Sequence, residues 1–247
     1  METTCIFKRI EKKYLLSEYQ YDALFSRIGD HLQQDEFGRS TVMSLYLDTP
    51  DHRIIRNSIE AVNYKEKLRL RSYGTAAANT KVFLELKKKF NGVVYKRRVV
   101  MPLADAERYL EQGVKPFESQ IMSEIDWTMK LYGWPKPAML IACEREAWFA
   151  ENHPDLRLTF DRGIRYRQQE LSLSSGSVGY GLLPENTVLL EIKTGGAMPL
   201  WLADALDAEG ILPGSLSKYG AAYTRSVQDN KHPNLSIKGG SKHVVNF

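Results

Sequence analysis

The segment "KVFLELKKKFNGVVYKRRVVM", residues 81–101, constrains the fold more than any other part of this chain. Asn91-Gly92 between two runs of strand-forming residues is typical of a two-residue β-hairpin turn. Such a turn sets the register of its strands, and here it predicts three facing pairs: Phe90 with Val93, Lys87 with Lys96, and Glu85 with Arg98. The segment therefore predicts two antiparallel strands that are paired residue by residue.

This register gives the hairpin two different faces, because successive side chains of a strand point to opposite sides. One face is mainly apolar and includes Leu84, Leu86 and Val99. The other carries Glu85, Lys87, Lys96 and Arg98. The apolar face can form a core, whereas like charges directly opposite each other destabilise a sheet. The charged face therefore needs an explanation.

The same alternation recurs in other segments that read as strands. "YKEKLRLRSY", residues 64–73, places Lys67, Arg69 and Arg71 on one side. Further strands are predicted at 5–16, 42–49, 138–149, 155–161 and 187–194. At the corresponding positions these strands carry Arg9, Glu11, Lys13, Arg145, Arg157, Glu191 and Lys193. In a single antiparallel sheet, charges from at least six strands would gather on one face.

The remaining periodic segments predict helices. A helix is expected over 17–34, where Ser17 and Gln20 form a capping box. Others are expected near 50–60, over 103–131 with a glycine end at Gly113, and over 198–208 and 217–225. No linker or internal repeat divides the chain. We expect one domain over 1–229 and a polar, flexible tail over 230–247.

Composition excludes several classes of protein. Hydrophobic residues are 43% and charged residues 26%, which is ordinary for a globular protein. No apolar run approaches the ~18 residues of a membrane span, and the N-terminus has no apolar signal region. The two cysteines and five histidines show no metal-binding spacing. A cytoplasmic protein without membrane insertion is expected.

The charged face has two interpretations. It faces water in an open sheet, or it lines an interior. Because the positions are mainly Lys and Arg, and because Arg145 lies among apolar residues, we favour the interior. The predicted fold class is α+β, a closed antiparallel β-barrel with helices packed outside. Its interior cations require a polyanion or several phosphates. A nucleic-acid groove is disfavoured, since aromatic residues do not interleave with the basic positions.

Nine segments within residues 7–225 carry a resemblance to a known family: "RIEKKYLL", "SLYLDTPD", "KLRLRSYG", "VFLELKKK", "YKRRV", "CEREAWF", "LRLTFD", "LLEIKTG" and "SKYG". In this order they resemble a VTC domain, the polyphosphate polymerase member of the CYTH or triphosphate tunnel metalloenzyme superfamily. The resemblance implies an antiparallel β-barrel around a tunnel that is lined by basic residues.

The resemblance also implies roles for individual residues. The catalytic positions are Lys13, Arg69, Arg71, Lys87, Arg145 and Lys218. The further phosphate-binding positions are Lys67, Lys96, Arg98, Arg157 and Lys193. Glu191 matches the metal-binding glutamate, where the family uses Mn²⁺ or Mg²⁺. The first strand reads Arg9-x-Glu11-x-Lys13 instead of the Glu-x-Glu-x-Lys of the wider superfamily. This departure is typical of the VTC branch and argues against a two-metal triphosphatase site.

The function implied is a polyphosphate polymerase that moves the γ-phosphate of ATP to a growing polyphosphate chain. ATP and inorganic polyphosphate are the expected partners, and family members often work beside a membrane protein. Two alternatives use the same basic tunnel. One is hydrolysis of tripolyphosphate or a nucleoside triphosphate, and the other is a sensor that binds polyphosphate or inositol polyphosphates without turnover.

Several of these residues also have purely structural interpretations. Glu85 and Arg98 form a cross-strand ion pair in the predicted register. Asp161 is placed to cap the turn into Arg162-Gly163, and Ser217 is placed to cap the helix that contains Lys218. Tyr46 and Asp48 share a strand face that ends at a turn.

Overall fold

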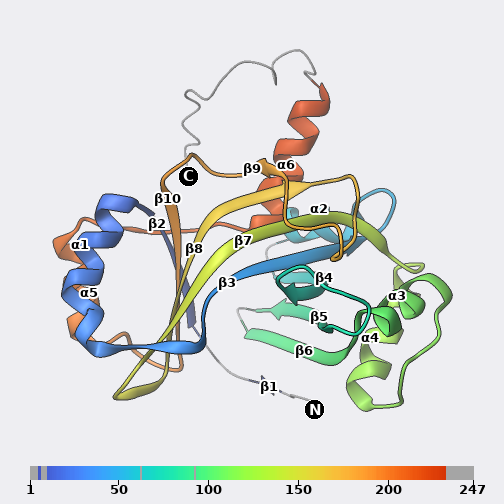
Figure 1. The fold of residues 1–247 in the computed structure, drawn as a ribbon, viewed down its shortest axis with the longest axis horizontal. Helices are drawn as coiled ribbons and strands as arrows, with labels where there is room; N and C mark the ends of the chain where they lie inside the picture. The colour runs from blue at the N-terminus through green and yellow to red at the C-terminus, as the bar shows by residue number, and fades with distance from the viewer. Residues whose placement is uncertain (1–4, 7–9, 62, 92, 232–247) are drawn as a thin grey trace. The chain divides into compact units, whose positions relative to one another are not determined.

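The computed structural model describes residues 5–6, 10–61, 63–91 and 93–231 (Figure 1). Its strands are β1 (Cys5–Ile6), β2 (Ile10–Ser17), β3 (Leu32–Asp48), β4 (Tyr64–Tyr73), β5 (Lys81–Phe90), β6 (Val93–Pro102), β7 (Lys136–Ala150), β8 (His153–Arg167), β9 (Tyr180–Gly181), β10 (Thr187–Thr194) and β11 (Pro213–Gly214). Its helices are α1 (Glu18–Ile28), α2 (Arg53–Glu60), α3 (Leu103–Gln112), α4 (Gln120–Leu131), α5 (Leu200–Ala208) and α6 (Lys218–Lys231), with a 3₁₀ turn, η1 (Gly29–His31).

The strands form a large antiparallel sheet, so the α+β class is confirmed. Hydrogen-bonded neighbours follow the order β1-β6-β5-β4-β3-β7-β8-β10-β2-β11, and β9 pairs with β8. This path has two ends, β1 and β11, and no pairing among the described residues joins them. The hydrogen-bonded sheet is therefore open among the described residues, and the predicted closure into a barrel is not confirmed.

The contacts divide the chain into two compact units. Among the described residues, unit 1 contains 5–6, 41–61, 63–91, 93–143 and 165–180, and unit 2 contains 10–40, 144–164 and 181–231. The single domain expected over 1–229 stays a prediction. Helix α6 extends to Lys231, and the rest of the expected tail lies outside the described residues.

The hairpin of unit 1 has the predicted register. Strands β5 and β6 pair Phe90 with Val93, Lys87 with Lys96 and Glu85 with Arg98. Asn91 has the positive φ of 46° that the turn requires, whereas Gly92 lies outside the described residues. Strand β4 adds Lys67 opposite Lys87 and Arg69 opposite Glu85. The charged positions of three strands therefore lie in two rows across the sheet.

The opposite face of these strands forms the core of unit 1. Leu84, Leu86 and Val99 are each no more than 1% exposed. They belong to the same cluster as Tyr109 of α3 and Ile125 of α4. Figure 1 shows α3 and α4 beside this part of the sheet. The helices bury this apolar face, on which Arg97 pairs with Glu124 of α4, whereas the rows of Lys, Arg and Glu85 lie on the other face.

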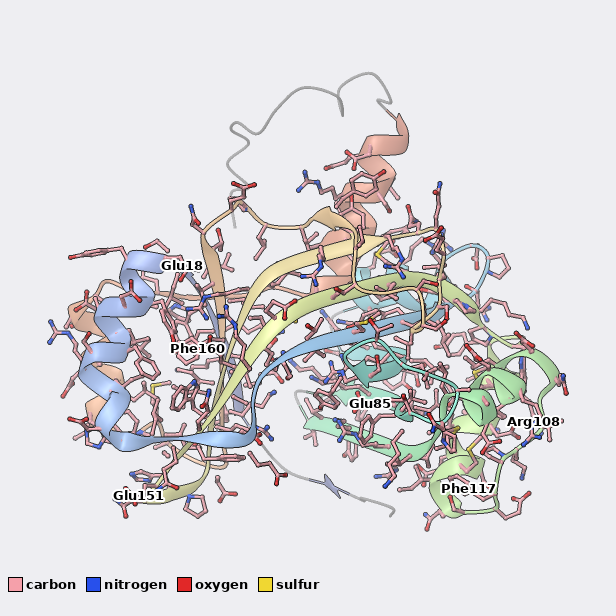
Figure 2. The ribbon with its side chains drawn as sticks, in the orientation of Figure 1. Glu18, Glu85, Arg108, Phe117, Glu151 and Phe160 are labelled. Atoms are coloured by element: carbon pink, nitrogen blue, oxygen red, sulfur yellow. The ribbon has the colours of Figure 1, made fainter. Side chains whose placement is uncertain are left out.

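The sheet of unit 2 likewise has one apolar face and one charged face. Its central strand β10 pairs with β2 on one side and β8 on the other. Val188, Leu190 and Ile192 of β10 enter the buried apolar cluster to which α1 and α5 contribute. Phe160 belongs to that cluster (Figure 2). Its ring meets the Tyr21 ring edge-on, with 5.0 Å between centroids. The alternate residues Glu191 and Lys193 consequently point to the other face.

The helix expected over 17–34 is correct only in its first part. The capping box is confirmed, because the Gln20 N–H donates to Ser17 Oγ and the Ser17 N–H donates to Gln20 Oε1. However, α1 ends at Ile28 and β3 begins at Leu32. Gly29 disfavours a continued helix, and Leu32 packs into the unit 2 core from the strand. Tertiary burial therefore overrides the helical spacing of Leu32.

Candidate functional site

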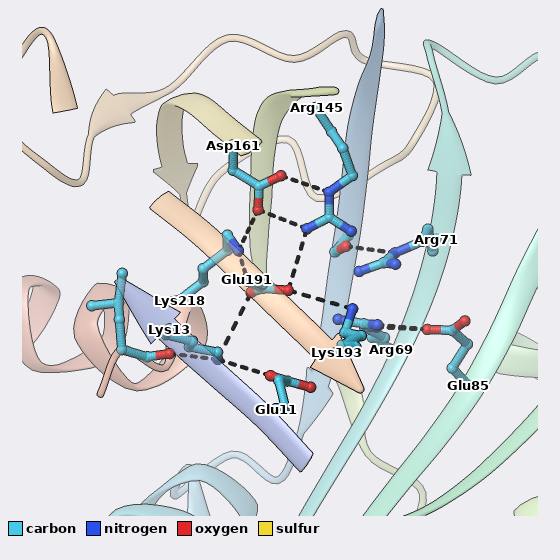
Figure 3. Close-up of polar contacts among 12 residues, drawn as sticks. Glu11, Lys13, Arg69, Arg71, Glu85, Arg145, Asp161, Glu191, Lys193 and Lys218 are labelled. Atoms are coloured by element: carbon cyan, nitrogen blue, oxygen red, sulfur yellow. Dashed lines mark hydrogen bonds and ion pairs between the residues drawn. The ribbon is translucent and has the colours of Figure 1, made fainter. Parts of the chain in front are cut away.

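The charged face of unit 1 centres on one buried carboxylate. Glu85 is 1% exposed, and its two oxygens accept hydrogen bonds from three cations. Arg69 Nε lies 2.8 Å from Oε2 (Figure 3). Arg98 Nε lies 2.6 Å from Oε1, and Lys96 Nζ lies 2.8 Å from Oε1. We call Glu85, these three cations, Arg71 and Tyr46 the Glu85 cluster.

Strand register explains how this cluster forms. Arg69 and Arg98 are the direct cross-strand neighbours of Glu85 in β4 and β6. Strand β3 supplies Tyr46 opposite Arg69, and the Arg69 Nη1 donates to the Tyr46 hydroxyl at 3.2 Å. It also supplies Ser44, whose Oγ accepts from Arg71 Nε at 3.2 Å. The polar residues of β3 thus hold the two arginines in place.

Positive charge exceeds negative charge in the Glu85 cluster. Burial by itself raises the pKa of Glu85, but Arg69, Arg71, Lys96 and Arg98 hold that pKa well below its usual range. One ionised carboxylate therefore faces four cations. The next row of the same face places Lys67 opposite Lys87 and Lys87 opposite Lys96. Like charges directly opposite each other in a sheet are destabilising by themselves.

Two groups of the Glu85 cluster have pKa values near neutrality. Burial lowers the pKa of Lys96 to about 7; Glu85 opposes this shift and Arg98 adds to it. Burial raises the pKa of Tyr46, but Arg69, Lys67 and Arg71 outweigh burial and bring it down to about 8. The electrostatic field of the arginines and lysines is therefore strong enough to lower the pKa of a buried tyrosine, although burial alone would raise it.

A second cluster lies in unit 2 around Glu191, which is 7% exposed. Lys218 Nζ lies 3.0 Å from Glu191 Oε1, and Lys13 Nζ lies 3.8 Å from the same oxygen (Figure 3). On the other oxygen, Oε2, Lys193 Nζ lies at 3.6 Å and Arg145 Nη2 at 3.8 Å. We call these five residues, Glu11 and Asp161 the Glu191 cluster.

Asp161 is the anchor of the Glu191 cluster and is fully buried. Arg145 binds it with two hydrogen bonds, Nε to Oδ1 at 2.5 Å and Nη2 to Oδ2 at 2.6 Å. Lys218 Nζ lies 2.6 Å from Oδ2. Lys13 is held by Glu11 at 3.3 Å and by the Leu216 carbonyl oxygen at 2.7 Å. Fixed partners therefore orient three of the four cations.

Both carboxylates at the centre of this cluster are ionised. Burial raises the pKa of Asp161, yet Arg145 and Lys218 bring it down to about 2. Burial likewise raises the pKa of Glu191, but Lys218, Lys193, Arg145 and Lys13 hold it well below its usual range. The Glu191 cluster thus combines fixed anions with four cations, whereas the Glu85 cluster is strongly cationic.

The structure brings most of the sequence-predicted residues into these two clusters. The Glu85 cluster contains Arg69, Arg71, Lys96 and Arg98. The Glu191 cluster contains Lys13, Arg145, Lys193, Lys218 and Glu191. Lys67 and Lys87 lie in the row beside the Glu85 cluster. Arg157 instead pairs with Asp35 at 2.5 Å and lies over the Phe149 ring. Its phosphate-binding role stays a prediction, as do the roles of the others.

Some of the purely structural roles predicted for individual residues are confirmed, and one is wrong. The Glu85–Arg98 ion pair is confirmed, and Ser217 caps α6 through the Gly220 N–H at 3.0 Å. Asp48 accepts hydrogen bonds from the first turn of α2. Asp161 is no turn cap but a partner of Arg145. Its alternation with Arg157 was the signal that placed it on the charged face.

The Glu191 cluster offers few protein ligands for a divalent metal. Among the described residues no group of three or more His, Cys, Asp or Glu side chains is placed to hold a metal ion. Glu191 is nevertheless an ionised oxygen ligand beside ionised Asp161. Mg²⁺ is commonly held by one or two carboxylates, with waters and substrate phosphates as its other ligands. The residues present fit such a phosphate-bound ion.

Comparisons with known proteins agree with the fold. The model of the VTC domain family matches residues 8–227. A protein from Bacillus halodurans, described as a candidate adenylate cyclase, is 14% identical and has a TM-score of 0.53, covering 85% of this chain and 93% of its own. A candidate adenylyl cyclase from Hippeastrum, described as having a dominant triphosphatase activity, is 18% identical with a TM-score of 0.48, covering 89% and 96%. No curated protein matches the sequence significantly.

Proposed function

Because the chain belongs to the VTC domain family, we propose that it is a polyphosphate polymerase. In the proposed reaction, the γ-phosphate of ATP is transferred to the end of a growing inorganic polyphosphate chain. The family assignment covers residues 8–227 and therefore includes every residue of both clusters. The proposal concerns the activity, the donor and the product, which the family assignment alone leaves open.

The excess of positive charge in the Glu85 cluster carries this proposal. Arg69, Lys96 and Arg98 contact one carboxylate that is 1% exposed, and Arg71 acts on it through charge. Cations at partly buried positions need a counter-charge, and Glu85 supplies only one. A linear polyanion with one charge per repeating unit supplies the rest. Arginine forks bind two phosphate oxygens at once, and lysines add point charge.

Phosphoryl transfer places modest covalent demands on a protein. It requires alignment of the attacking and leaving oxygens and stabilisation of charge on the transferred group. The cations of the two clusters are suited to this because their partners fix them before substrate arrives. Arg145 is held by Asp161, and Arg69 is held by Glu85 and Tyr46. We therefore assign to these arginines the binding and orientation of phosphate oxygens.

Glu191, with Asp161 beside it, would hold the Mn²⁺ or Mg²⁺ that the proposed reaction requires. When bound, such an ion would supply positive charge that offsets the charge of the phosphates. The chain's own contribution is to keep the Glu191 carboxylate ionised and in position. Lys218, at 3.0 Å, is the one cation within hydrogen-bond distance of it among the described residues.

The direct test is incubation of the purified protein with ATP and Mn²⁺ or Mg²⁺, followed by gel analysis of chain length. Long polyphosphate chains are expected. Orthophosphate as the only product would contradict the polymerase and identify a hydrolase. Binding of polyphosphate without turnover would identify a sensor domain. The three outcomes separate the proposed function from its two alternatives.

A pair of variants tests the role of the metal. Glu191→Gln removes the carboxylate charge but keeps the shape, and we expect loss of metal-stimulated turnover. Metal-free binding of tripolyphosphate should persist or strengthen, because a negative charge facing the anion is removed. Glu151→Gln is the matched control in unit 2, since Glu151 is exposed and pairs with Gln33. Equal metal stimulation in both variants would contradict the role of Glu191.

Among the described residues, no helix is long and apolar enough to span a lipid bilayer. The expected cytoplasmic location and a neighbouring membrane protein are further parts of this proposal. Co-purification with membranes that is lost after a salt wash would support a peripheral association of that kind.

A further inference from the structure

Thr159 has a buried hydroxyl group to which the proposed mechanism assigns no role. Its side chain lies in β8, and the residue is only 2% exposed. Among the described residues, its Oγ1 is buried and has no hydrogen-bond partner. A buried polar group without a partner is uncommon and destabilising. Thr159 is therefore retained at a thermodynamic cost that calls for a reason.

The strand register places Thr159 beside the central carboxylate of the Glu191 cluster. Thr159 is the direct cross-strand partner of Glu191 in β10. Directly opposed residues of an antiparallel pair lie on the same face, with Cβ atoms about 4.5–5.5 Å apart. Arg157 and Asp161 flank Thr159 on that face. The hydroxyl thus belongs to the charged face and is a near neighbour of Glu191.

The contacts of Glu191 show what this hydroxyl is able to do. Lys218 alone among the described residues lies within hydrogen-bond distance of the carboxylate, at 3.0 Å. Lys13, Lys193 and Arg145 approach at 3.6 to 3.8 Å and act mainly through charge. A bound polyphosphate competes for all four cations. Glu191 would then lose its donors while remaining a buried anion.

We propose that Thr159 is a positioning residue, whose hydroxyl donates a hydrogen bond to Glu191 when phosphate draws the cations away. This inference rests on the proposed function. A neutral hydroxyl suits this task because bound polyphosphate attracts a neutral group much less strongly than it attracts a lysine. The threonine side chain has three staggered rotamers, so its hydroxyl is able to turn toward the carboxylate opposite. Being buried, Thr159 acts through Glu191 and not on phosphate itself.

The test compares Thr159→Val with Thr159→Ser. Valine keeps the branched shape and lacks the hydroxyl, whereas serine keeps the hydroxyl. We expect the free Thr159→Val protein to melt at an equal or higher temperature, because an unpartnered polar group has been removed. Its affinity for tripolyphosphate with Mg²⁺, measured by calorimetry, should fall about ten-fold, as for other groups that orient a metal ligand. Thr159→Ser should restore that affinity.

The controls separate this role from general stability. Without Mg²⁺, phosphate still draws the cations from Glu191 but there is no metal to orient, so the difference in tripolyphosphate affinity between wild type and Thr159→Val should be smaller than with Mg²⁺. Thr128→Val is the matched control: Thr128 is 1% exposed, and its hydroxyl donates to the Glu124 carbonyl oxygen in α4 of unit 1. This variant should lose stability and keep its affinity for tripolyphosphate with Mg²⁺.

Three results would overturn the inference in distinguishable ways. If Thr159→Val binds tripolyphosphate with Mg²⁺ as tightly as wild type does, Thr159 has no positioning role and the proposed function stands. If Thr159→Val melts well below wild type, the hydroxyl already has a partner in the free protein. If wild type itself binds no tripolyphosphate, the proposed function fails and this inference fails with it.

Discussion

The Arg145 guanidinium binds the Asp161 carboxylate through two parallel hydrogen bonds, of 2.5 and 2.6 Å, at a carboxylate with no solvent exposure. Buried charges are stable only when they are paired and hydrogen-bonded. The pair therefore fixes the direction of Arg145 in advance of any ligand. Loss of the Asp161 carboxylate should therefore have a measurable effect on stability.

We expect Asp161→Asn to lower the free energy of unfolding by about 3–5 kcal/mol, because the buried cations lose their main partner. Urea unfolding monitored by fluorescence measures this change. Asp204→Asn, at an exposed position of α5 in the same unit, is the control and should change stability little. A loss below about 1 kcal/mol for Asp161→Asn would show that the ion pair contributes as little as a surface pair.

Glu85→Gln tests whether the Glu85 cluster is an anion site. The substitution leaves Arg69, Arg71 and Arg98 around a neutral amide and removes the charge that raises the pKa of Lys96, so we expect a lower melting temperature at low salt. Millimolar tripolyphosphate should raise the melting temperature of the variant more than that of wild type, since the anion replaces the lost charge. Glu124→Gln removes the partner of Arg97 in the same unit and serves as the control. An equal shift in all three proteins would argue against specific binding.

Lys96 predicts a pH dependence of anion binding. Its pKa of about 7 is lowered from the usual value, so the free protein loses this proton above pH 7. Phosphate favours the protonated amine, and affinity for tripolyphosphate should therefore fall about ten-fold between pH 7 and pH 8.5 relative to Lys96→Arg. Arginine stays charged throughout. The comparison also cancels the ionisation of the ligand, and parallel profiles would contradict the prediction.

The same low pKa affects stability with the opposite sign. In the unfolded chain lysine keeps its proton to about pH 10.4, so the unfolded state binds more protons than the folded one above pH 7. The contribution of Lys96 to stability is therefore unfavourable at low pH and improves as pH rises from 7 toward 10. Unfolding free energies of wild type and Lys96→Met should converge as pH rises.

Tyr46 should titrate before the other tyrosines. Its pKa is lowered to about 8, because Arg69, Lys67 and Arg71 outweigh the effect of burial. Ultraviolet absorbance of tyrosinate should show one early step that Tyr46→Phe removes. Tyr109, whose pKa is raised by burial and by Asp126, is the control position. An unchanged titration curve in Tyr46→Phe would contradict the strong local field.

Arg69→Ala and Arg71→Ala test the two arginines of β4 separately. We expect each to weaken tripolyphosphate binding ten-fold or more, by about the value of a hydrogen bond to a charged group. The fold should persist, because both side chains lie on the face opposite the apolar core. Arg108→Ala, on the exposed side of α3, is the control. Full affinity in both variants would mean that these arginines serve the fold and do not bind phosphate.

The local pattern of the sequence was sufficient for the faces and for much of the pairing. Asn91-Gly92 and the alternation around it predicted that Glu85 meets Arg98 and that Lys87 meets Lys96, as the structure shows. The capping box at Ser17 was readable for the same reason, since all of its atoms come from neighbouring residues. Interactions within a hairpin or a helix turn depend on backbone geometry alone.

Only the tertiary structure decided where α1 ends, which carboxylate holds which cation, and which hydroxyl lacks a partner. Leu32 leaves the helical pattern because the unit 2 core buries it from a strand. Arg157 pairs with Asp35 across 122 positions, although alternation grouped it with Lys193. A strand pattern defines the side on which a charge lies. The partner on that side is chosen by distance and burial, which depend on residues far away in the chain.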